Sequence, residues 1–194
     1  LHLSTPPELE MDVSIDNRLM KRIGGGRNFK RFAFDMKTFS MDADFMEFYT
    51  FSGDFFRRIV NTAFYTIEDV DLTEPLDKYV GKSQNSYNFI LAPLSYAGTY
   101  GIFIGQPDTY DAYCVFGTRG IDDNADPEFG NLALYRREAW HQFGHSFVNP
   151  LTARDIDAVN RFRKLFDPIA GQMRKAGVRN WEECVNEHIV RAIM

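Results

Sequence analysis

The sequence has few of the residues that would cross-link the chain or anchor it in a membrane. Its 194 residues include two cysteines, Cys114 and Cys184, too few and too far apart for a disulfide framework, although one bond between them stays open. No run of 18 apolar residues is present, so we expect no membrane-spanning segment. The sequence lacks a signal-peptide pattern, and because it begins at Leu1 we expect a processed or trimmed chain. The net charge of −5 gives no electrostatic reason to expect nucleic acid as a partner.

Apolar and aromatic side chains are abundant. Hydrophobic residues make up 44% of the chain, with 18 Phe and 9 Tyr, which is typical of a globular protein. The length suits one domain, or one domain with a small appendage. We expect residues 41–194 to form this domain and residues 1–40 to be an N-terminal leader, with a short helix around residues 14–23.

The hydrophobic period changes along the expected domain. Between residues 42 and 70, apolar residues recur at helical spacing around Gly53, which predicts one kinked helix or two short ones. We expect the aromatic stripe of this segment to lie in the core. Short β-branched and aromatic runs separated by turn residues then predict two or three antiparallel strands, at residues 87–94, 101–104 and 112–118.

Helices are expected to follow the strands. A helix over residues 132–148 should end at Asn149 and Pro150, because the residue before a proline avoids helical geometry. Thr152 or Asp155 is a candidate cap for another helix that continues through Phe166. A last helix begins near residue 180, with acidic residues in its first turn. Strands followed by helices predict an α+β fold.

Two of the chain's four histidines lie one helical turn apart. His141 and His145 therefore project from the same face of the expected helix. The H-E-x-x-H metallopeptidases bind zinc with this spacing, and the glutamate after the first histidine takes a proton from the zinc-bound water. Here Gln142 occupies this general-base position. A structural role, with both histidines hydrogen-bonded in the interior, is the alternative.

A catalytic zinc site needs a third protein ligand. Glu187 is the best candidate because it lies on a later helix, where Arg191 one turn further on would orient its carboxylate. The alternative is an ordinary surface pair of Glu187 and Arg191. His188 and Glu183 are further candidate ligands.

Two segments resemble a known family. Residues 141–150 read H-Q-F-G-H-S-F-V-N-P and resemble the H-E-F-G-H-S-F-V-N-P signature of a bacterial family of predicted metallopeptidases, a domain of unknown function similar to the thermolysin-like gluzincins in its ligand pattern. Residues 186–192 resemble its downstream N-E-x-x-V-R-A segment. The resemblance covers about residues 40–194. It implies that His141, His145 and Glu187 bind zinc (Zn2+), that the substrate is a peptide or protein, and that the protein is exported, secreted or lipid-anchored.

The chain departs from this family in two ways. Gln142 replaces the glutamate, and an amide does not usefully accept a proton at neutral pH. The replacement is explained by an engineered inactivation, by a natural loss that gives a pseudopeptidase, or by Glu138 acting as the base from the previous turn. In addition, relatives continue beyond the third-ligand helix, so we expect a C-terminal portion to be missing, with any oxyanion-stabilising residue that it carries.

Two classes of function follow from these residues. The first is a zinc metallopeptidase with impaired or abolished hydrolysis, in which residues 110–118 bind an extended peptide by edge pairing. The second is a non-catalytic peptide- or protein-binding module. It would contain a structural zinc with Glu138 or His188 as fourth ligand, or no metal. The sequence specifies neither a substrate nor an oligomeric state.

Overall fold

The structure is a computed structural model that describes residues 4–10, 20–21 and 24–194. The short helix expected around residues 14–23 falls almost wholly outside the described residues. The chain divides into two compact units, Leu1–Arg58 and Ile59–Met194, a division that lies further along the chain than the expected boundary at residue 40. Each unit is described by itself.

The first unit is built from consecutive helices. Helix α2 (Gly26–Asp42) occupies part of the expected leader, and α3 (Phe45–Phe51) follows it. Helix α4 (Gly53–Ile67) begins in this unit and continues into the second. The segment around Gly53 therefore forms two helices, one of the two arrangements predicted.

Most of the aromatic stripe of α3 and α4 is not buried, so its expected place in the core is wrong. Phe48 and Phe64 are more than half exposed, and of the stripe only Ile59, at 4%, is buried. The rings of Phe45, Tyr49 and Phe56 contact one another along the helices. Helical spacing predicts that apolar residues share a face, but it does not predict that another element covers that face.

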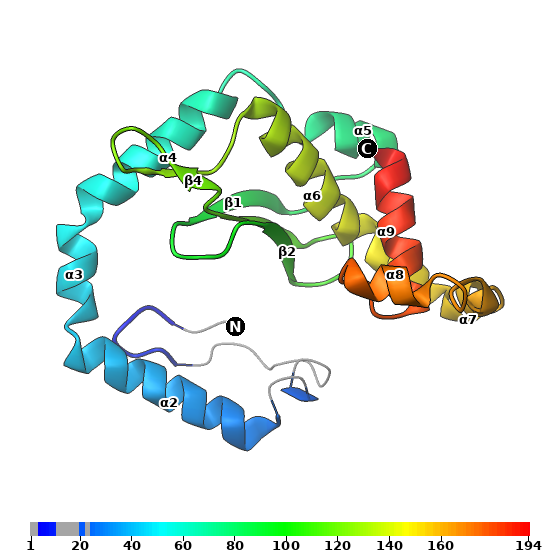
Figure 1. Ribbon diagram of the computed structural model, residues 1–194, viewed down its shortest axis with the longest axis horizontal. Coiled ribbons are helices and arrows are strands. Elements are labelled where there is room, and N and C mark those ends of the chain that lie inside the picture. Colours follow the sequence, from blue (N-terminus) through cyan, green and yellow to red (C-terminus); the bar gives the residue numbers. More distant parts are fainter. Residues whose placement is uncertain (1–3, 11–19, 22–23) are drawn as a thin grey trace. The chain divides into compact units, whose positions relative to one another are not determined.

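The second unit contains a three-stranded sheet with β3 in the centre (Figure 1). Its strands are β1 (Ser86–Ala92), β2 (Thr99–Ile104) and β3 (Asp111–Gly117). Strand β2 pairs antiparallel with β3, but β1 pairs parallel with β3, so the expected all-antiparallel sheet is wrong. Turn residues show where strands end, but not which strands become neighbours. Helix α5 (Glu74–Val80) precedes the sheet, and the short strands β4 (Gly120–Ile121) and β5 (Pro127–Glu128) follow it.

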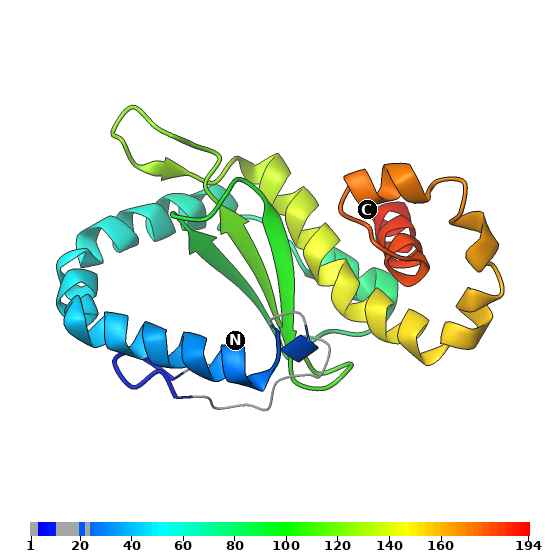
Figure 2. The same cartoon turned by 60° about the horizontal axis from the view of Figure 1, so that its bottom comes forward.

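Helix α6 (Leu132–Arg154) packs on this sheet and forms the core with it (Figure 2). Phe143 of α6 contacts Phe89 of β1, and Tyr135 contacts Phe116 of β3. Cys114 lies fully buried in β3; it and the buried Cys184 are both free thiols. The expected α+β fold is confirmed.

Helix α6 continues through Pro150, so the end predicted at Asn149 and Pro150 is wrong. Proline removes one backbone N–H, but packing beyond it holds the helix together. The buried Thr152 hydroxyl lies 3.3 Å from the carbonyl oxygen of Val148 and 2.5 Å from Oδ1 of Asn186, on the last helix. Tertiary contacts here outweigh the local preference of the sequence.

The helices between α6 and the last helix are shorter than predicted. Helix α7 (Ile156–Asn160) ends before Phe166, and a 3₁₀ turn, η1 (Arg163–Leu165), and α8 (Ala170–Lys175) follow. Helix α9 (Trp181–Ile193) begins as predicted, where the Asn180 side chain accepts a hydrogen bond from the backbone N–H of Glu183. Within the described part of the chain, no helix combines the length and apolar character needed to cross a membrane.

Candidate metal centre

Helices α6 and α9 approach each other closely enough to share a site. Gly144 permits this approach, because a Cβ atom at this position would lie 3.3 Å from Cγ1 of Val190. At the start of α9, the Trp181 indole N–H donates to the carbonyl oxygen of Val159, at 2.7 Å. These contacts hold α9 in a defined position against α6 and α7.

Three side chains converge between the two helices. His141 and His145 project from α6, and their Nε2 atoms lie 3.3 Å apart. From α9, Glu187 places Oε2 3.5 Å from His141 Nε2 and Oε1 3.3 Å from His145 Nε2. All three side chains are half-buried. The structure thus joins the histidine pair to the predicted third residue as a candidate metal-binding triad.

The ligand atoms of the triad lie close enough together to hold one metal ion. Zinc binds nitrogen and oxygen ligands at about 2.0–2.2 Å with tetrahedral geometry, which separates neighbouring donor atoms by roughly 3.3 Å. In the triad the two Nε2 atoms are 3.3 Å apart, and His141 and His145 contact different oxygens of Glu187, at 3.5 and 3.3 Å. Three ligands are also the number that leaves a fourth position open in catalytic zinc sites.

Asn149 contacts the ring of His145. Its Oδ1 atom lies 3.1 Å from Nδ1 of His145, one turn along α6. An amide oxygen only accepts hydrogen bonds, so this contact favours the neutral tautomer with its proton on Nδ1. In this tautomer the lone pair of Nε2, the atom that faces the triad, is free to bind a metal.

Glu187 is ionised at neutral pH. Contacts with His141 and His145 hold the pKa of Glu187 far below its usual value, although burial opposes them. Arg191 lies 3.4 Å from Oε2 of Glu187, as expected for a residue that orients the carboxylate. The Arg191 side chain is 67% exposed, so water screens its charge and its main effect is on orientation.

The Glu138 carboxylate makes its contacts with residues outside the triad. Its carboxylate accepts a hydrogen bond from Thr99 Oγ1, lies 2.6 Å from a nitrogen of Arg137, and lies 3.8 Å from Arg119. Burial by itself raises the pKa of Glu138, but these hydrogen bonds and the two positive charges outweigh it, and the pKa is lowered. A low-pKa carboxylate with these partners is a poor general base.

Gln142 lies beside strand β2. Its amide Nε2 is 3.4 Å from Thr99 Oγ1. A Cβ atom added to Gly101 would lie 3.2 Å from the Gln142 Oε1 atom, so the strand can run this close to the helix because residue 101 has no side chain. Thr99 and Gly101 were not predicted to belong to the site, and nothing in their local sequence indicates it. Asn149 also was not predicted, although its spacing of four residues from His145 was a usable signal.

The two further candidate ligands have other partners. Glu183 accepts hydrogen bonds from the Arg179 backbone N–H, at 2.7 Å, and from the Asn180 side chain, at 3.0 Å, so it caps α9. His188 Nδ1 is 2.7 Å from the carbonyl oxygen of Cys184. Neither residue belongs to the metal-binding group found among the described residues.

The expected peptide-binding edge is also misplaced. Residues 110–118 form β3, which is paired on both sides and has no free edge. Strand β2 lies at the end of the sheet, and its outer edge has no strand partner among the described residues. The edge next to Gln142 therefore belongs to β2.

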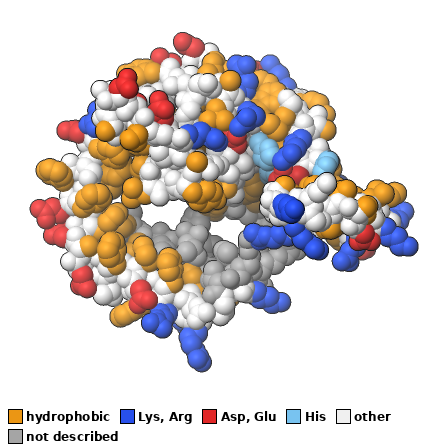
Figure 3. Space-filling model, viewed as in Figure 1, with side chains coloured by type: hydrophobic (Ala, Val, Ile, Leu, Met, Phe, Trp, Pro, Cys, Tyr) orange, Lys and Arg blue, Asp and Glu red, His pale blue; other side chains and the backbone are white. Residues whose placement is uncertain are grey.

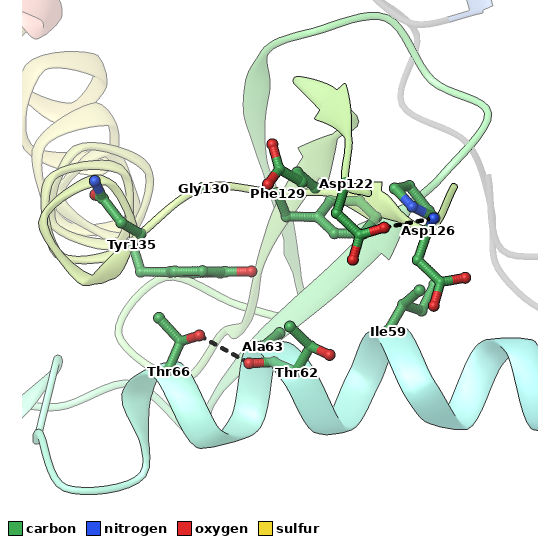
Figure 4. A pocket seen from close by; sticks show the side chains of 12 residues that line it. Ile59, Thr62, Ala63, Thr66, Asp122, Asp126, Phe129, Gly130 and Tyr135 are labelled. Atoms are coloured by element: carbon green, nitrogen blue, oxygen red, sulfur yellow. Dashed lines mark hydrogen bonds between the residues drawn. The ribbon is translucent and has the colours of Figure 1, made fainter. Parts of the chain in front are cut away.

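A separate cavity of about 360 Å³ lies between α4, the β4–β5 hairpin and the start of α6 (Figure 4). The buried Tyr135 side chain points into it, and burial raises the pKa of Tyr135 to about 12. No triad residue lines this cavity. It is therefore distinct from the candidate metal centre.

The comparisons with known proteins give a family but no activity. The profile of one family, described as a domain of unknown function (DUF4932), matches residues 1–194. No curated protein and no solved structure matches the chain.

Proposed function

The chain belongs to the DUF4932 family, and we propose that it is a zinc metallopeptidase scaffold whose hydrolysis is impaired or abolished by Gln142. The observation that carries this proposal is the convergence of one ligand atom each from His141, His145 and Glu187 within 4.8 Å of one another. The resemblance of the sequence around these residues to predicted metallopeptidases supports the same assignment.

Each residue of the proposed site has a defined role. His141, His145 and Glu187 hold the metal, while Asn149 and Arg191 orient two of these ligands. Zinc at such a site polarises a carbonyl group and lowers the pKa of water. Glu187 contributes a negative charge, because its pKa lies far below its usual value.

Gln142 limits the chemistry of the site. Its amide donates and accepts hydrogen bonds, so it is able to position water or substrate, but it does not take up a proton at neutral pH. Glu138 does not replace it, because its carboxylate is held by Thr99 and Arg137.

Strand β2 is the proposed docking edge for a peptide substrate. An extended peptide adds to an unpaired sheet edge through backbone hydrogen bonds. The contact between Thr99 and Gln142 places this edge directly beside the helix that bears the two histidines. The edge would thus align a peptide bond with the site.

Metal content tests the proposed site. Native mass spectrometry of tag-free protein, before and after zinc addition, should show one zinc per chain in the wild type and none in Glu187→Ala. Glu182→Ala, a glutamate of the same helix outside the triad, should keep its zinc. A wild type that takes up no zinc, or a Glu187→Ala variant that binds it as the wild type does, would overturn the proposal.

Restoring the base tests the proposed reaction. Gln142→Glu should raise hydrolysis of an unfolded, fluorescently labelled protein by about 10²–10⁴-fold, the usual contribution of a general base. The double variant Gln142→Glu, Glu187→Ala should show no such gain.

The second candidate function is non-catalytic peptide binding. The lack of an available carboxylate at the general-base position favours it, since Gln142 is an amide and Glu138 is engaged elsewhere. Zinc bound by both the wild type and Gln142→Glu, with no hydrolysis by either, would identify this function in place of the first.

A further inference from the structure

A short part of the second unit carries a charge opposite to that of the chain as a whole. Residues 161–179 contain six basic residues and one acidic residue, whereas the net charge of the chain is −5. Figure 3 shows Lys and Arg side chains gathered over the region of α7 and α8. Like charges concentrated in this way repel one another and attract anions.

Three arginines from this segment line one cavity, which we call the arginine pocket. It measures about 570 Å³ and lies between α7, η1, α8 and the first turn of α9. Arg163 comes from η1, Arg174 from α8, and Arg179 from the loop before α9. Asp167 and Glu182 line the same cavity.

The three guanidinium groups have no partner among the described residues. No hydrogen bond or ion pair joins any of them to Asp167, to Glu182 or to another described side chain. An arginine carries five N–H donors in a planar fork that matches carboxylate and phosphate oxygens. These donors remain available to a ligand.

A hydrophobic cluster forms one side of the pocket. Phe166 is 7% exposed and packs with Val178 and Cys184, and the half-buried Trp181 packs against them. The indole N–H of Trp181 donates a hydrogen bond to the carbonyl oxygen of Val159, which fixes the position of the ring. Phe166 and Trp181 both line the cavity, so its interior offers apolar surface as well as positive charge.

We propose that the arginine pocket binds a small organic anion, in which a carboxylate or phosphate group is attached to an apolar body. The arginines would hold the anionic group, and the surface of Phe166 and Trp181 would cover the apolar part. The volume lies in the range of small-molecule sites. The pocket is separate from the candidate metal centre, because no residue of the metal triad lines it.

Isothermal titration with three related compounds tests this inference. The probes are 3-phenylpropionate, phenyl phosphate and the neutral 3-phenylpropionamide. We expect saturable binding of at least one anion, weakening as salt is added, and no binding of the amide. The tighter of the two anions would identify the group that the pocket prefers. Equal binding of the amide, or no binding of either anion, would overturn the inference.

A matched pair of variants locates the binding site. Arg174→Gln should weaken binding at least tenfold, because hydrogen bonds to charged groups are among the stronger ones. Arg161→Gln removes an equally charged residue of the same segment from outside the lining and should change the affinity less than about twofold. If both variants weakened anion binding equally, the anion would be attracted only by the overall positive charge of the segment, and this would contradict a specific pocket. Both arginines are exposed, and unchanged circular dichroism would confirm that the variants fold.

Discussion

At the scale of single residues, Asn149 connects the fold to the metal centre. Its Oδ1 atom lies 3.1 Å from Nδ1 of His145 and favours the tautomer whose Nε2 lone pair is free. Asn149→Ala should therefore lower zinc affinity by about 10–100-fold, the usual effect of removing a residue that orients a metal-binding histidine. Competition with a chromophoric chelator measures this change. Gln172→Ala, an exposed amide on α8, should leave the affinity unaltered. An unchanged affinity in Asn149→Ala would mean that the contact does not set the state of His145.

Glu138 joins α6 to strand β2 through its hydrogen bond with Thr99. Its pKa in the folded protein is lowered, so the stability that its charge provides is complete above its unfolded-state pKa and is lost as the pH falls through the folded-state value. Glu138→Gln should reduce the free energy of unfolding at pH 7 by about 1–3 kcal/mol. The difference in the free energy of unfolding between the unaltered protein and Glu138→Gln should become smaller below about pH 4.

Urea unfolding at several pH values measures this dependence. Glu128→Gln, which changes an exposed glutamate of β5, provides the control and should have little effect at any pH. If the difference caused by Glu138→Gln stayed constant from pH 7 to pH 3, the charge of Glu138 would not be its source.

At the scale of elements, the site depends on the distance between α6 and α9. Gly144→Val would place methyl groups against Val190, which is fully buried, and should cost about 1–3 kcal/mol of stability through overpacking. The same change should weaken zinc binding, because α9 carries Glu187. Thermal unfolding and zinc titration measure the two effects.

Gly171→Val is the matched control for this change. It alters a helical glycine with nothing within 4 Å of the added Cβ atom. The control should retain zinc affinity and lose at most about 0.5 kcal/mol of stability. Wild-type zinc affinity in Gly144→Val would show that the spacing of the two helices does not control the site.

Local sequence signals predicted the elements better than their pairing. The strands and the start of α9 lie close to their predicted positions, since β-branched runs, turn residues and the Asn180 cap act locally. The parallel pairing of β1 and β3 and the continuation of α6 through Pro150 depend on contacts between distant residues. The His141–His145 pair was evident from its spacing, whereas the approach of β2 at Gly101 was not.

At the scale of the whole molecule, the two units differ in how their apolar residues are used. In the second unit, buried residues of β3 and α6 form a core from opposite sides of one interface. In the first unit, Phe34 and Phe51 remain exposed. A hydrophobic stripe states which residues share a face, and only the tertiary structure determines whether that face is covered.

The triad also links two points that are distant along the chain. A metal held by His145 and Glu187 would close a covalent-like loop around residues 146–186, which include the whole of the arginine pocket. The ligands come together only in the folded chain, so a bound ion would stabilise the folded form of this part of the molecule. Amide hydrogens of α7 and α8 should then exchange more slowly with zinc than without it. An anion pocket enclosed in this way would be most ordered when the metal is in place.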